Sequence, residues 1–340
     1  MKKRIAINGL GRIGRLVLGA LLKDKTVQIV ALNDIGTPEN IAYLLAHSSD
    51  YGSYVSGLPV QFEDMHLRIG KERIPFFKES CADKLPWKEL SVDLVLDCSG
   101  ANNSLEKAGK HLLAGARKVL LSSAAGDNIP CVVYGINDNS ISKEDSIISA
   151  ASCSTVGLCP LALALNAIAP IEKGIATTIH ALTPTQMVLD DPQKKGNLRR
   201  SRSGLTNIIP TTAAFAKAVG RVLPELDGKL SGYAIRVPVA RGSLITLYAV
   251  VSYGGTEEFT ASKLNEHMSH KVTDSFGYTD EELVSSDFAG TTFYSVFDAT
   301  QTKVTRINKD SYLVEVAAWF DNETSYVSSF IKLASKISAF

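Results

Sequence analysis

The sequence predicts a two-domain α/β protein, in which a parallel, doubly wound sheet is followed by an α+β domain with a mostly antiparallel sheet. Three observations support this fold class. The chain has 340 residues, a length typical of two domains. Its first half alternates short β-rich runs with helical patterns. Its second half contains longer β-rich segments that are joined partly by turns.

The first half begins with a short strand and an amphipathic helix. RIAIN is a β-rich run, and in RIGRLVLGALLKD the apolar residues recur at helical spacing. The alternation continues, so that strands are expected at 4–8, 27–33, 92–100 and 118–123, and helices at 12–24 and 104–115. Strands that alternate with helices in this way form parallel sheets.

The second half has a different pattern. Segments such as SLITLYAVVSY and SYLVEVAAWF are long enough for the strands of an antiparallel sheet with helices on one face. Strands are expected at 176–183, 231–239, 243–253 and 311–320, and helices around 212–223, 259–272 and 322–338. The predicted domains are 1–152, with the helix 322–340 packing back on it, and 153–321.

Composition and charge exclude several classes of function. Hydrophobic residues make up 45% and charged residues 21% of the chain, as in ordinary globular proteins. A formal net charge of +1 gives no reason to expect nucleic acid or an anionic membrane as a partner. No apolar stretch approaches the roughly 18 to 20 residues that cross a bilayer. The opening MKKRIAINGLGRIGR does not have the pattern of a signal peptide, so we expect a cytoplasmic protein.

The cysteines favour neither a metal site nor disulfides. There are five, an odd number, and none forms a CxxC pair. We therefore expect no metal. Because cysteines are often simply buried, four of them are expected in the core: Cys81, Cys98, Cys131 and Cys159.

The segment INGLGRIG predicts a dinucleotide site. Gly9, Gly11 and Gly14 have GxGxxG spacing, follow a strand and open a helix, and Asp34 ends the next strand. The alternative is a glycine-rich turn without a ligand, but this context favours a Rossmann-type site in which the helix N-terminus binds the pyrophosphate. Asp34 would accept bonds from the adenosine ribose and repel a 2′-phosphate, which favours NAD over NADP.

Residues 150–160, AASCSTVGLCP, raise the question whether Cys153 is reactive. A thiol attacks as thiolate, and its reference pKa is about 8.5. Cys153 precedes a helical pattern, whose N-terminus would favour negative charge, and His180 ends a strand and could pair with the thiolate as imidazolium. We expect both to lower the thiol pKa. The alternative is that Cys153 and His180 are ordinary core residues.

Several sequence blocks across the chain favour a reactive Cys153 and His180 over two ordinary core residues. Together, and in this order, the blocks resemble those of the phosphorylating glyceraldehyde-3-phosphate dehydrogenases. The blocks are INGLGRIGR, SCST, TTIHALTPTQ, LRRSRSGLTNIIPT, GYAIRVPV, LVSSDF, FDATQT and WFDNETSY. The resemblance implies a glycolytic enzyme with NAD as its cofactor. It also implies a cytosolic homotetramer in which a loop, here about 183–208, reaches a neighbouring subunit.

The resemblance also implies roles for individual residues. Cys153 would be the nucleophile and His180 the acid/base. The residues implied for the cofactor are Gly9, Gly11, Arg12, Ile13, Asp34, Ser122 and, for the nicotinamide carboxamide, Asn322. Those implied for the substrate's phosphate and for inorganic phosphate are Thr183 and Arg236, and Ser152, Ser154, Arg200 and Thr212.

The sequence departs from the family pattern mainly near the phosphate sites. Val156 stands where Asn is typical, Ala213 and Ala214 where Thr-Gly is typical, and Ser123-Ala124 where Ala-Pro is typical. These departures put the strength of phosphate binding in question.

The implied chemistry oxidises an aldehyde through a thioester. Cys153 would add to glyceraldehyde 3-phosphate, His180 would take the hydroxyl proton as hydride leaves for the nicotinamide, and phosphate would release 1,3-bisphosphoglycerate. One alternative is a dehydrogenase of a related aldehyde, such as erythrose 4-phosphate, whose thioester is hydrolysed. Another is an NAD-binding redox sensor without turnover. The arginines of LRRSR could also form only a solvated basic loop, and Asn322 only a helix cap.

Overall fold

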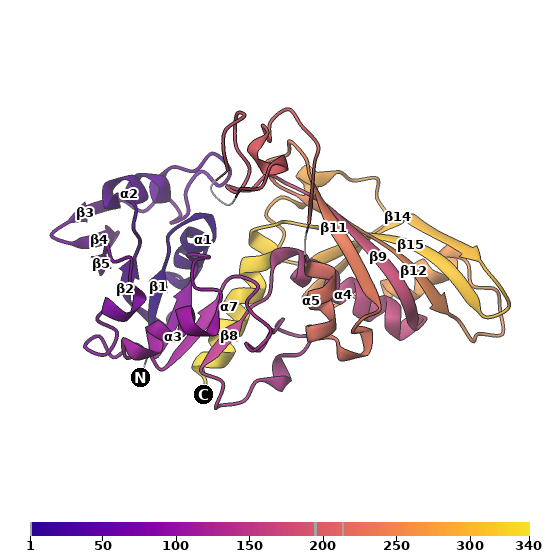
Figure 1. Cartoon of the computed structure of the whole chain (residues 1–340), viewed down its shortest axis with the longest axis horizontal. Coiled ribbons are helices and arrows are strands. Elements are labelled where there is room, and N and C mark those ends of the chain that lie inside the picture. Colours follow the sequence, from indigo (N-terminus) through magenta and orange to yellow (C-terminus); the bar gives the residue numbers. More distant parts are fainter. Residues whose placement is uncertain (1, 194–195, 213) are drawn as a thin grey trace. The chain divides into compact units, whose positions relative to one another are not determined.

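The computed structural model describes residues 2–193, 196–212 and 214–340 (Figure 1). The chain divides into two compact units. Unit 1 comprises Met1–Ala151 and Ser329–Phe340, and unit 2 comprises Ser152–Ser328. The ranges predicted for a cofactor domain and a catalytic domain, 1–152 and 153–321, remain a prediction about which part does what.

Unit 1 is built on a sheet of eight strands within the described residues. Their spatial order is β3 (Val60–Glu63), β4 (His66–Ile69), β5 (Glu72–Phe77), β2 (Val27–Asn33), β1 (Lys3–Asn8), β6 (Leu94–Asp97), β7 (Lys118–Leu121) and β8 (Ile147–Ser149). The pairs from β5 to β8 are parallel, whereas β3, β4 and β5 pair antiparallel. The central strands are apolar on both faces, as parallel strands under helices are.

The order of these strands creates a switch point between β1 and β6. From β1 the chain builds the sheet outward through β2, and from β6 it builds in the opposite direction through β7 and β8. Ligands of doubly wound sheets bind at the carboxyl ends of the strands beside such a point. The helices of this unit are α1 (Arg12–Leu21), α2 (Pro38–Ala46) and α3 (Leu105–Leu113).

Unit 2 is built on a sheet of seven described strands. Their order is β10 (Ile209–Thr212), β11 (Leu230–Arg236), β9 (Ile171–His180), β12 (Ser243–Ser252), β15 (Ser311–Phe320), β14 (Ser295–Arg306) and β13 (Phe276–Thr279). Only β11 with β9 and β13 with β14 are parallel among these pairs. The parallel-rich first sheet and the mostly antiparallel second sheet confirm the predicted fold class.

The main helix of unit 2 is α4 (Cys153–Ile168), which is buried along most of its length. Its Gly157 lies against Ile245 of β12 and Phe320 of β15, so α4 covers one face of the sheet. The other helices are α5 (Phe215–Val222), α6 (Ala261–Ser269) and α7 (Thr324–Ser338), which continues into unit 1. In unit 1 the end of α7 is anchored by Lys336, whose Nζ lies 2.6 Å from Asp138 Oδ2.

The structure corrects part of the expectation about cysteines. Cys131 and Cys159 are buried as predicted, but Cys81 and Cys98 are partly exposed. Cys98 follows the end of β6 and lines a pocket there, and Cys81 precedes a short 3-10 turn. No helix in the described part of the chain is both long and apolar enough to span a lipid bilayer.

Candidate active site and dinucleotide pocket

The glycine turn after β1 has the geometry that a bound pyrophosphate requires. Gly9 has a φ of +93°, and a Cβ added to it would lie 2.6 Å from Ser99 N. A Cβ on Gly14 would lie 1.9 Å from Gly9 O, so α1 packs directly on the turn. At Gly11, in contrast, no other heavy atom lies within 4 Å of the Cβ position. The backbone is therefore open to an approaching ligand at Gly11.

A pocket of about 310 Å³ lies beside this turn, at the switch point of the sheet. It is lined by Asn8, Gly9, Gly11, Asn33, Asp34, Ile35, Glu79, Ser80, Cys98, Ser99, Ala101 and Asn102. Asp34 Oδ2 accepts a bond from Leu10 N at 2.6 Å, and its Oδ1 accepts one from Gly36 N at 2.7 Å. Each carboxylate oxygen retains a lone pair for a ribose hydroxyl.

The residues of this pocket fit a dinucleotide. Gly11 is the N-cap of α1 and offers no side-chain cap, and the first turn of α1 holds no acidic residue, so the N–H groups are available to a phosphate. Of the predicted cofactor residues, Gly9, Gly11 and Asp34 line the pocket. Arg12, Ile13 and Ser122 are not among its lining residues: Arg12 pairs with Asp50 at 3.1 Å, and Ser122 N donates to Asp97 O.

The predicted catalytic pair meets in unit 2. Cys153 is the first residue of α4, and His180 is the last residue of β9. Cys153 Sγ lies 3.4 Å from His180 Nε2. His180 Nδ1 lies 2.7 Å from the carbonyl oxygen of Ala181, and only a protonated Nδ1 can donate there. Nε2 is therefore the unprotonated nitrogen of the neutral ring, and it faces the thiol as an acceptor.

The predicted lowering of the thiol pKa is wrong for this structure. Burial raises the pKa of the Cys153 thiol more than the nearby Arg236 and the hydrogen bonds of Ser154 lower it. Burial, and secondly the charge of Arg236, lower the pKa of His180 to about 3. The resting pair is thus a thiol and a neutral imidazole, because two positive charges beside a buried ring disfavour the imidazolium.

Arg236 adds a positive charge next to this pair. It ends β11 and stands opposite His180 in the parallel pairing of β11 with β9. Its Nη1 lies 3.4 Å from Ala181 O, and its buried Nε has no hydrogen-bond partner in the described structure. Burial lowers the pKa of Arg236 to about 10, so the guanidinium stays charged at neutral pH. An unpaired buried guanidinium donor is suited to an anionic substrate.

A second arginine reaches the site through a chain of hydroxyls. Arg200 lies in the 3-10 turn Arg199–Ser201, and its Nη1 donates to Thr185 Oγ1 at 2.5 Å. Thr185 Oγ1 lies 2.9 Å from Thr183 Oγ1, which also donates to Gln186 Oε1. The charge of Arg200 contributes to the lowered pKa of His180. The structure thus brings the predicted residues Thr183 and Arg200 together with the catalytic pair.

The residues predicted to bind inorganic phosphate differ in their exposure and in their hydrogen bonds. Ser152 caps α4, since its Oγ accepts from Thr155 N at 3.2 Å, and Ser154 is buried beside Cys153. Thr212 is the exposed last residue of β10. Ala214 precedes α5 as an N-cap without a side-chain bond, and Ala213 lies outside the described residues.

Asn322 is set at the start of α7 by its neighbour Asp321. The Oδ1 of Asp321 accepts from the backbone N–H groups of Glu323 and Thr324, and its Oδ2 lies 2.9 Å from Arg241 Nη2. Asn322 is only 5% exposed, yet its Oδ1 has no hydrogen-bond partner in the described structure. A buried, unsatisfied amide oxygen is what a residue that binds a carboxamide would present before its ligand arrives.

Comparison with known proteins identifies the family. The model of the glyceraldehyde 3-phosphate dehydrogenase NAD binding domain matches residues 3–105, and that of the C-terminal domain matches residues 152–322. The chain belongs to the glyceraldehyde-3-phosphate dehydrogenase family. The resemblance inferred from the sequence blocks is thereby confirmed, and so is NAD as the cofactor of the family's first domain.

Relatives with that name match the chain over nearly its whole length. The enzyme named glyceraldehyde-3-phosphate dehydrogenase in Clostridium acetobutylicum is 42% identical, covering 97% of this chain and 96% of the relative. Those of Lactobacillus delbrueckii subsp. bulgaricus and Streptococcus pyogenes are 40% and 38% identical, each covering 98% of this chain. The corresponding shares of the relatives are 98% and 97%.

Within this family fold, the structure adds site residues that the sequence reasoning did not name. Thr185 and Gln186 lie in the TPTQ segment, two and three residues after Thr183, and join its hydrogen-bond network. Asn8 and Asp97 are polar residues at the carboxyl ends of β1 and β6. A polar residue that ends a buried strand on each side of a switch point was the available signal.

Proposed function

We propose that this chain oxidises glyceraldehyde 3-phosphate with NAD and phosphate, through a thioester on Cys153. The observation that carries this assignment is the 3.4 Å approach of Cys153 Sγ to His180 Nε2, with Arg236 opposite His180 on the adjacent strand. These groups supply a nucleophile, a base and a cation for an anionic aldehyde. The activity is that of an NAD-dependent glyceraldehyde-3-phosphate dehydrogenase, as family membership implies.

The first half-reaction follows from the protonation states of the pair. His180 Nε2 accepts the thiol proton as Cys153 Sγ attacks the aldehyde carbon, and then returns the proton to the aldehyde oxygen, which gives a hemithioacetal. His180 next accepts the proton of that hydroxyl while the carbon loses a hydride. Bound NAD supplies the hydride acceptor. The product is a thioester on Cys153.

The second half-reaction releases the acyl group. An oxygen of inorganic phosphate attacks the thioester carbon and the C–S bond breaks, which gives 1,3-bisphosphoglycerate. The leaving thiolate takes the proton that His180 holds, so the pair returns to a thiol and a neutral imidazole. We assign the substrate's own phosphate to Thr183 and Arg236. We assign inorganic phosphate to Ser152, Ser154, Arg200 and Thr212. The hydroxyl chain from Thr183 to Arg200 supports both assignments, because it links hydroxyl and guanidinium donors in one network.

We assign the cofactor to Gly9, Gly11, Arg12, Ile13, Asp34, Ser122 and Asn322, in a cofactor domain of residues 1–152 joined by the last helix. The open backbone at Gly11 and the lone pairs of Asp34 support the adenosine and pyrophosphate part. The unsatisfied Oδ1 of Asn322 supports the nicotinamide part. A cytoplasmic location accords with a glycolytic role and remains a proposal.

The alternatives raised by the sequence lack a specific observation in their favour. Oxidation of erythrose 4-phosphate with hydrolysis would use Arg236 for the substrate's phosphate but would leave the site assigned to inorganic phosphate, with Arg200, without a role. Redox sensing without turnover would leave both phosphate sites without a role. The test is NADH formation from glyceraldehyde 3-phosphate and NAD, with and without phosphate. Formation of NADH that phosphate accelerates is expected. NADH formation that is indifferent to phosphate would favour hydrolysis, and absence of NADH would contradict the assignment.

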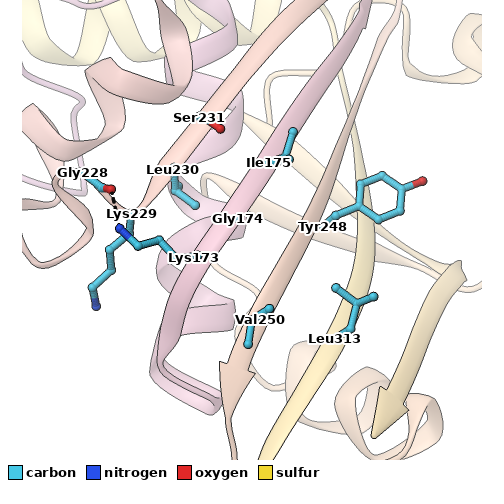
Figure 2. Close-up of a pocket in the computed structure, with 10 residues that line it drawn as sticks. All are labelled: Lys173, Gly174, Ile175, Gly228, Lys229, Leu230, Ser231, Tyr248, Val250 and Leu313. Atoms are coloured by element: carbon cyan, nitrogen blue, oxygen red, sulfur yellow. Dashed lines mark hydrogen bonds between the residues drawn. The ribbon is translucent and has the colours of Figure 1, made fainter. Parts of the chain in front are cut away.

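We also propose that the chain forms a homotetramer, and one sheet face of unit 2 supports self-association. Figure 2 shows Ile175, Tyr248, Val250 and Leu313 projecting from neighbouring strands β9, β12 and β15, around a cavity of about 380 Å³. Ile175, Tyr248 and Leu313 are exposed. Along β12 these positions alternate with the buried residues under α4, so they belong to the opposite face of the sheet. Exposed apolar side chains gathered on one sheet face support an interface with another copy of the chain.

A further inference from the structure

A buried carboxylate lies directly beneath the dinucleotide pocket. Asp97 ends β6 and is 3% exposed. Its Oδ1 accepts bonds from Ser99 N at 2.9 Å and Ser99 Oγ at 2.6 Å. Its Oδ2 accepts bonds from Asn8 Nδ2 at 3.1 Å and Asn102 Nδ2 at 2.7 Å, and it lies 2.9 Å from His111 Nε2. One side chain thus organises donors from three segments of unit 1.

The histidine that meets Asp97 is held by a tryptophan. His111 and Trp87 are both fully buried. Trp87 Nε1 donates to His111 Nδ1 at 2.9 Å, and an indole nitrogen is a donor only. Nδ1 of His111 must therefore be unprotonated, and Nε2 carries the hydrogen that is donated to Asp97. The polar chain runs from the apolar core at Trp87 to the pocket floor.

The partners of Asp97 are part of the pocket wall. Asn8, Ser99 and Asn102 all line the pocket, whereas Asp97 does not. The backbone of Ser99 is the surface against which Gly9 packs, since a Cβ on Gly9 would lie 2.6 Å from Ser99 N. Asn8 Oδ1 in turn accepts from Asn33 Nδ2 at 2.7 Å, next to Asp34. A displaced Asp97 would therefore disturb both the glycine turn and the neighbourhood of Asp34.

The hydrogen bonds around Asp97 favour its ionised form. Burial raises the pKa of Asp97, but the hydrogen bonds that it accepts from His111, Ser99 and Asn102 outweigh burial, so that the pKa lies below its ordinary value. An ionised carboxylate accepts all five bonds and donates none. A neutral amide in its place would turn an NH₂ group toward other donors.

We propose that Asp97 is a positioning residue for NAD, which acts through Asn8, Ser99 and Asn102 and is itself held in place by His111 and Trp87. The proposal rests on NAD binding by unit 1 and not on the aldehyde chemistry of unit 2. Its role is to fix the affinity for the dinucleotide. It has no part in the hydride or proton transfers.

The first test is the dissociation constant of NAD, measured by titration calorimetry on the full chain. Asp97→Asn is expected to weaken NAD binding about tenfold or more, while kcat at saturating NAD changes less than threefold. The matched control is Asp93→Asn, because the carboxylate of Asp93 also accepts a backbone N–H of β1, from Arg4 at 2.9 Å, but lies outside the pocket lining. The control is expected to bind NAD within twofold of the native chain.

A second pair of variants keeps the proposal testable where Asp97→Asn does not fold. His111→Gln retains a donor for Asp97 and an acceptor for Trp87, whereas His111→Leu retains neither. NAD affinity is expected to be near native in the first variant and at least fivefold weaker in the second. Equal affinity of both histidine variants, or native affinity in a folded Asp97→Asn chain, overturns the proposal. A native chain that binds NAD but forms no NADH would instead contradict the proposed function and leave this inference standing.

Discussion

At the scale of single residues, the resting state of Cys153 and His180 is the main correction to the sequence reasoning. The sequence favoured a thiolate–imidazolium pair, but burial disfavours both charged forms, and Arg236 further disfavours a charged ring. In the proposed mechanism, the thiol proton of Cys153 therefore moves to His180 during attack on the aldehyde. Adjacency of Cys153 and His180 was predictable from the blocks that carry them. Their degree of burial depends on tertiary packing, which the sequence does not display.

Replacing the acceptor should slow the chemistry without disturbing the cofactor. His180→Asn is expected to lower kcat for NADH formation about 10²-fold or more, since the thiol and hydroxyl protons lose their acceptor. The dissociation constant of NAD should stay within twofold, because His180 is not among the residues that line the dinucleotide pocket. The matched control is His270→Asn, an exposed histidine that, like His180, lies in unit 2. A kcat near native in His180→Asn would remove His180 from the mechanism.

The lowered pKa of His180 should also appear in the pH dependence of stability. Below its ordinary pKa of 6.5 the unfolded chain binds a proton at this histidine, and the folded chain does so only near a pKa of about 3. The free energy of unfolding should therefore fall as the pH falls from 6.5 toward 3, by up to about 1.4 kcal/mol per pH unit from this group.

Chemical denaturation at pH 6.5 and 4.5 measures this slope. The loss of unfolding free energy between the two values should be smaller in His180→Asn than in the native chain. It should be unchanged in His270→Asn, whose side chain is exposed in the fold. The same loss in all three proteins would mean that His180 titrates normally when folded.

At the scale of elements, two glycines of the turn after β1 have different roles. Gly14 is required for the packing of α1, whereas Gly11 is expected to be required for NAD binding. Gly14→Ala places a methyl group against Gly9 O, so it is expected to lower the free energy of unfolding by about 1–3 kcal/mol. Gly11→Ala meets nothing in the protein and should unfold like the native chain, but it should weaken NAD binding at least tenfold. Thermal unfolding measures the stability of each variant, and titration calorimetry measures its affinity for NAD. Native NAD affinity in Gly11→Ala would place the pyrophosphate elsewhere.

The start of α5 bears on the second half-reaction. Ala214 caps α5 without a side-chain bond, and Ala213 and Ala214 stand where the family pattern has Thr-Gly. A hydrogen bond to a charged group contributes roughly 1.5–3 kcal/mol, and 1.4 kcal/mol is one factor of ten. The KM for phosphate should therefore fall about tenfold or more in Ala213→Thr with Ala214→Gly. Equal KM values in the two proteins would mean that Thr212 already supplies the bond.

Some elements could be predicted from the sequence, and others could not. The strands at 27–33 and 311–320 have the predicted bounds, because each is a continuous apolar or alternating run between polar breaks. The strand β14, SVFDATQTKVTR, was not predicted, since its second half is polar and its pairing with β15 supplies the stabilisation. The strands β3 and β4 were missed because a four-residue strand carries too little pattern, and the six-residue strand β5 was missed as well.

At the scale of the whole molecule, the exposed apolar residues Ile175, Tyr248 and Leu313 on the sheet of unit 2 predict self-association. Leu313→Glu places a charge among Ile175, Tyr248 and Val250 and is expected to reduce the molar mass in solution, measured by light scattering after size exclusion. Leu113→Glu is the matched control, because Leu113 is an exposed leucine at the end of α3 in unit 1. Equal masses for the native chain and Leu313→Glu would exclude this face as an interface.

The overall arrangement shows why pockets are harder to predict than sheets. Alternating strands and helices predict a parallel sheet, and the glycine spacing locates the pyrophosphate turn. The wall that Asp97 organises depends on which strand ends lie side by side. Asn8 and Asp97 are adjacent in the register of β1 with β6, although 89 residues separate them in sequence. The residue pattern within one segment cannot show that Asn8 and Asp97 are neighbours in the folded chain.

In the proposed mechanism, the bond from His180 Nδ1 to the carbonyl of Ala181 determines how His180 accepts and returns protons over a full catalytic cycle. With Nδ1 committed to the backbone at 2.7 Å, the ring does not pass a proton through itself to solvent. Each proton enters and leaves by Nε2, so uptake and return must alternate in time. The imidazole therefore holds at most one transferred proton at a time, and burial together with the charge of Arg236 disfavours that protonated state. A single proton in transit implies that the rate of the chemical step varies linearly with the deuterium fraction of the solvent.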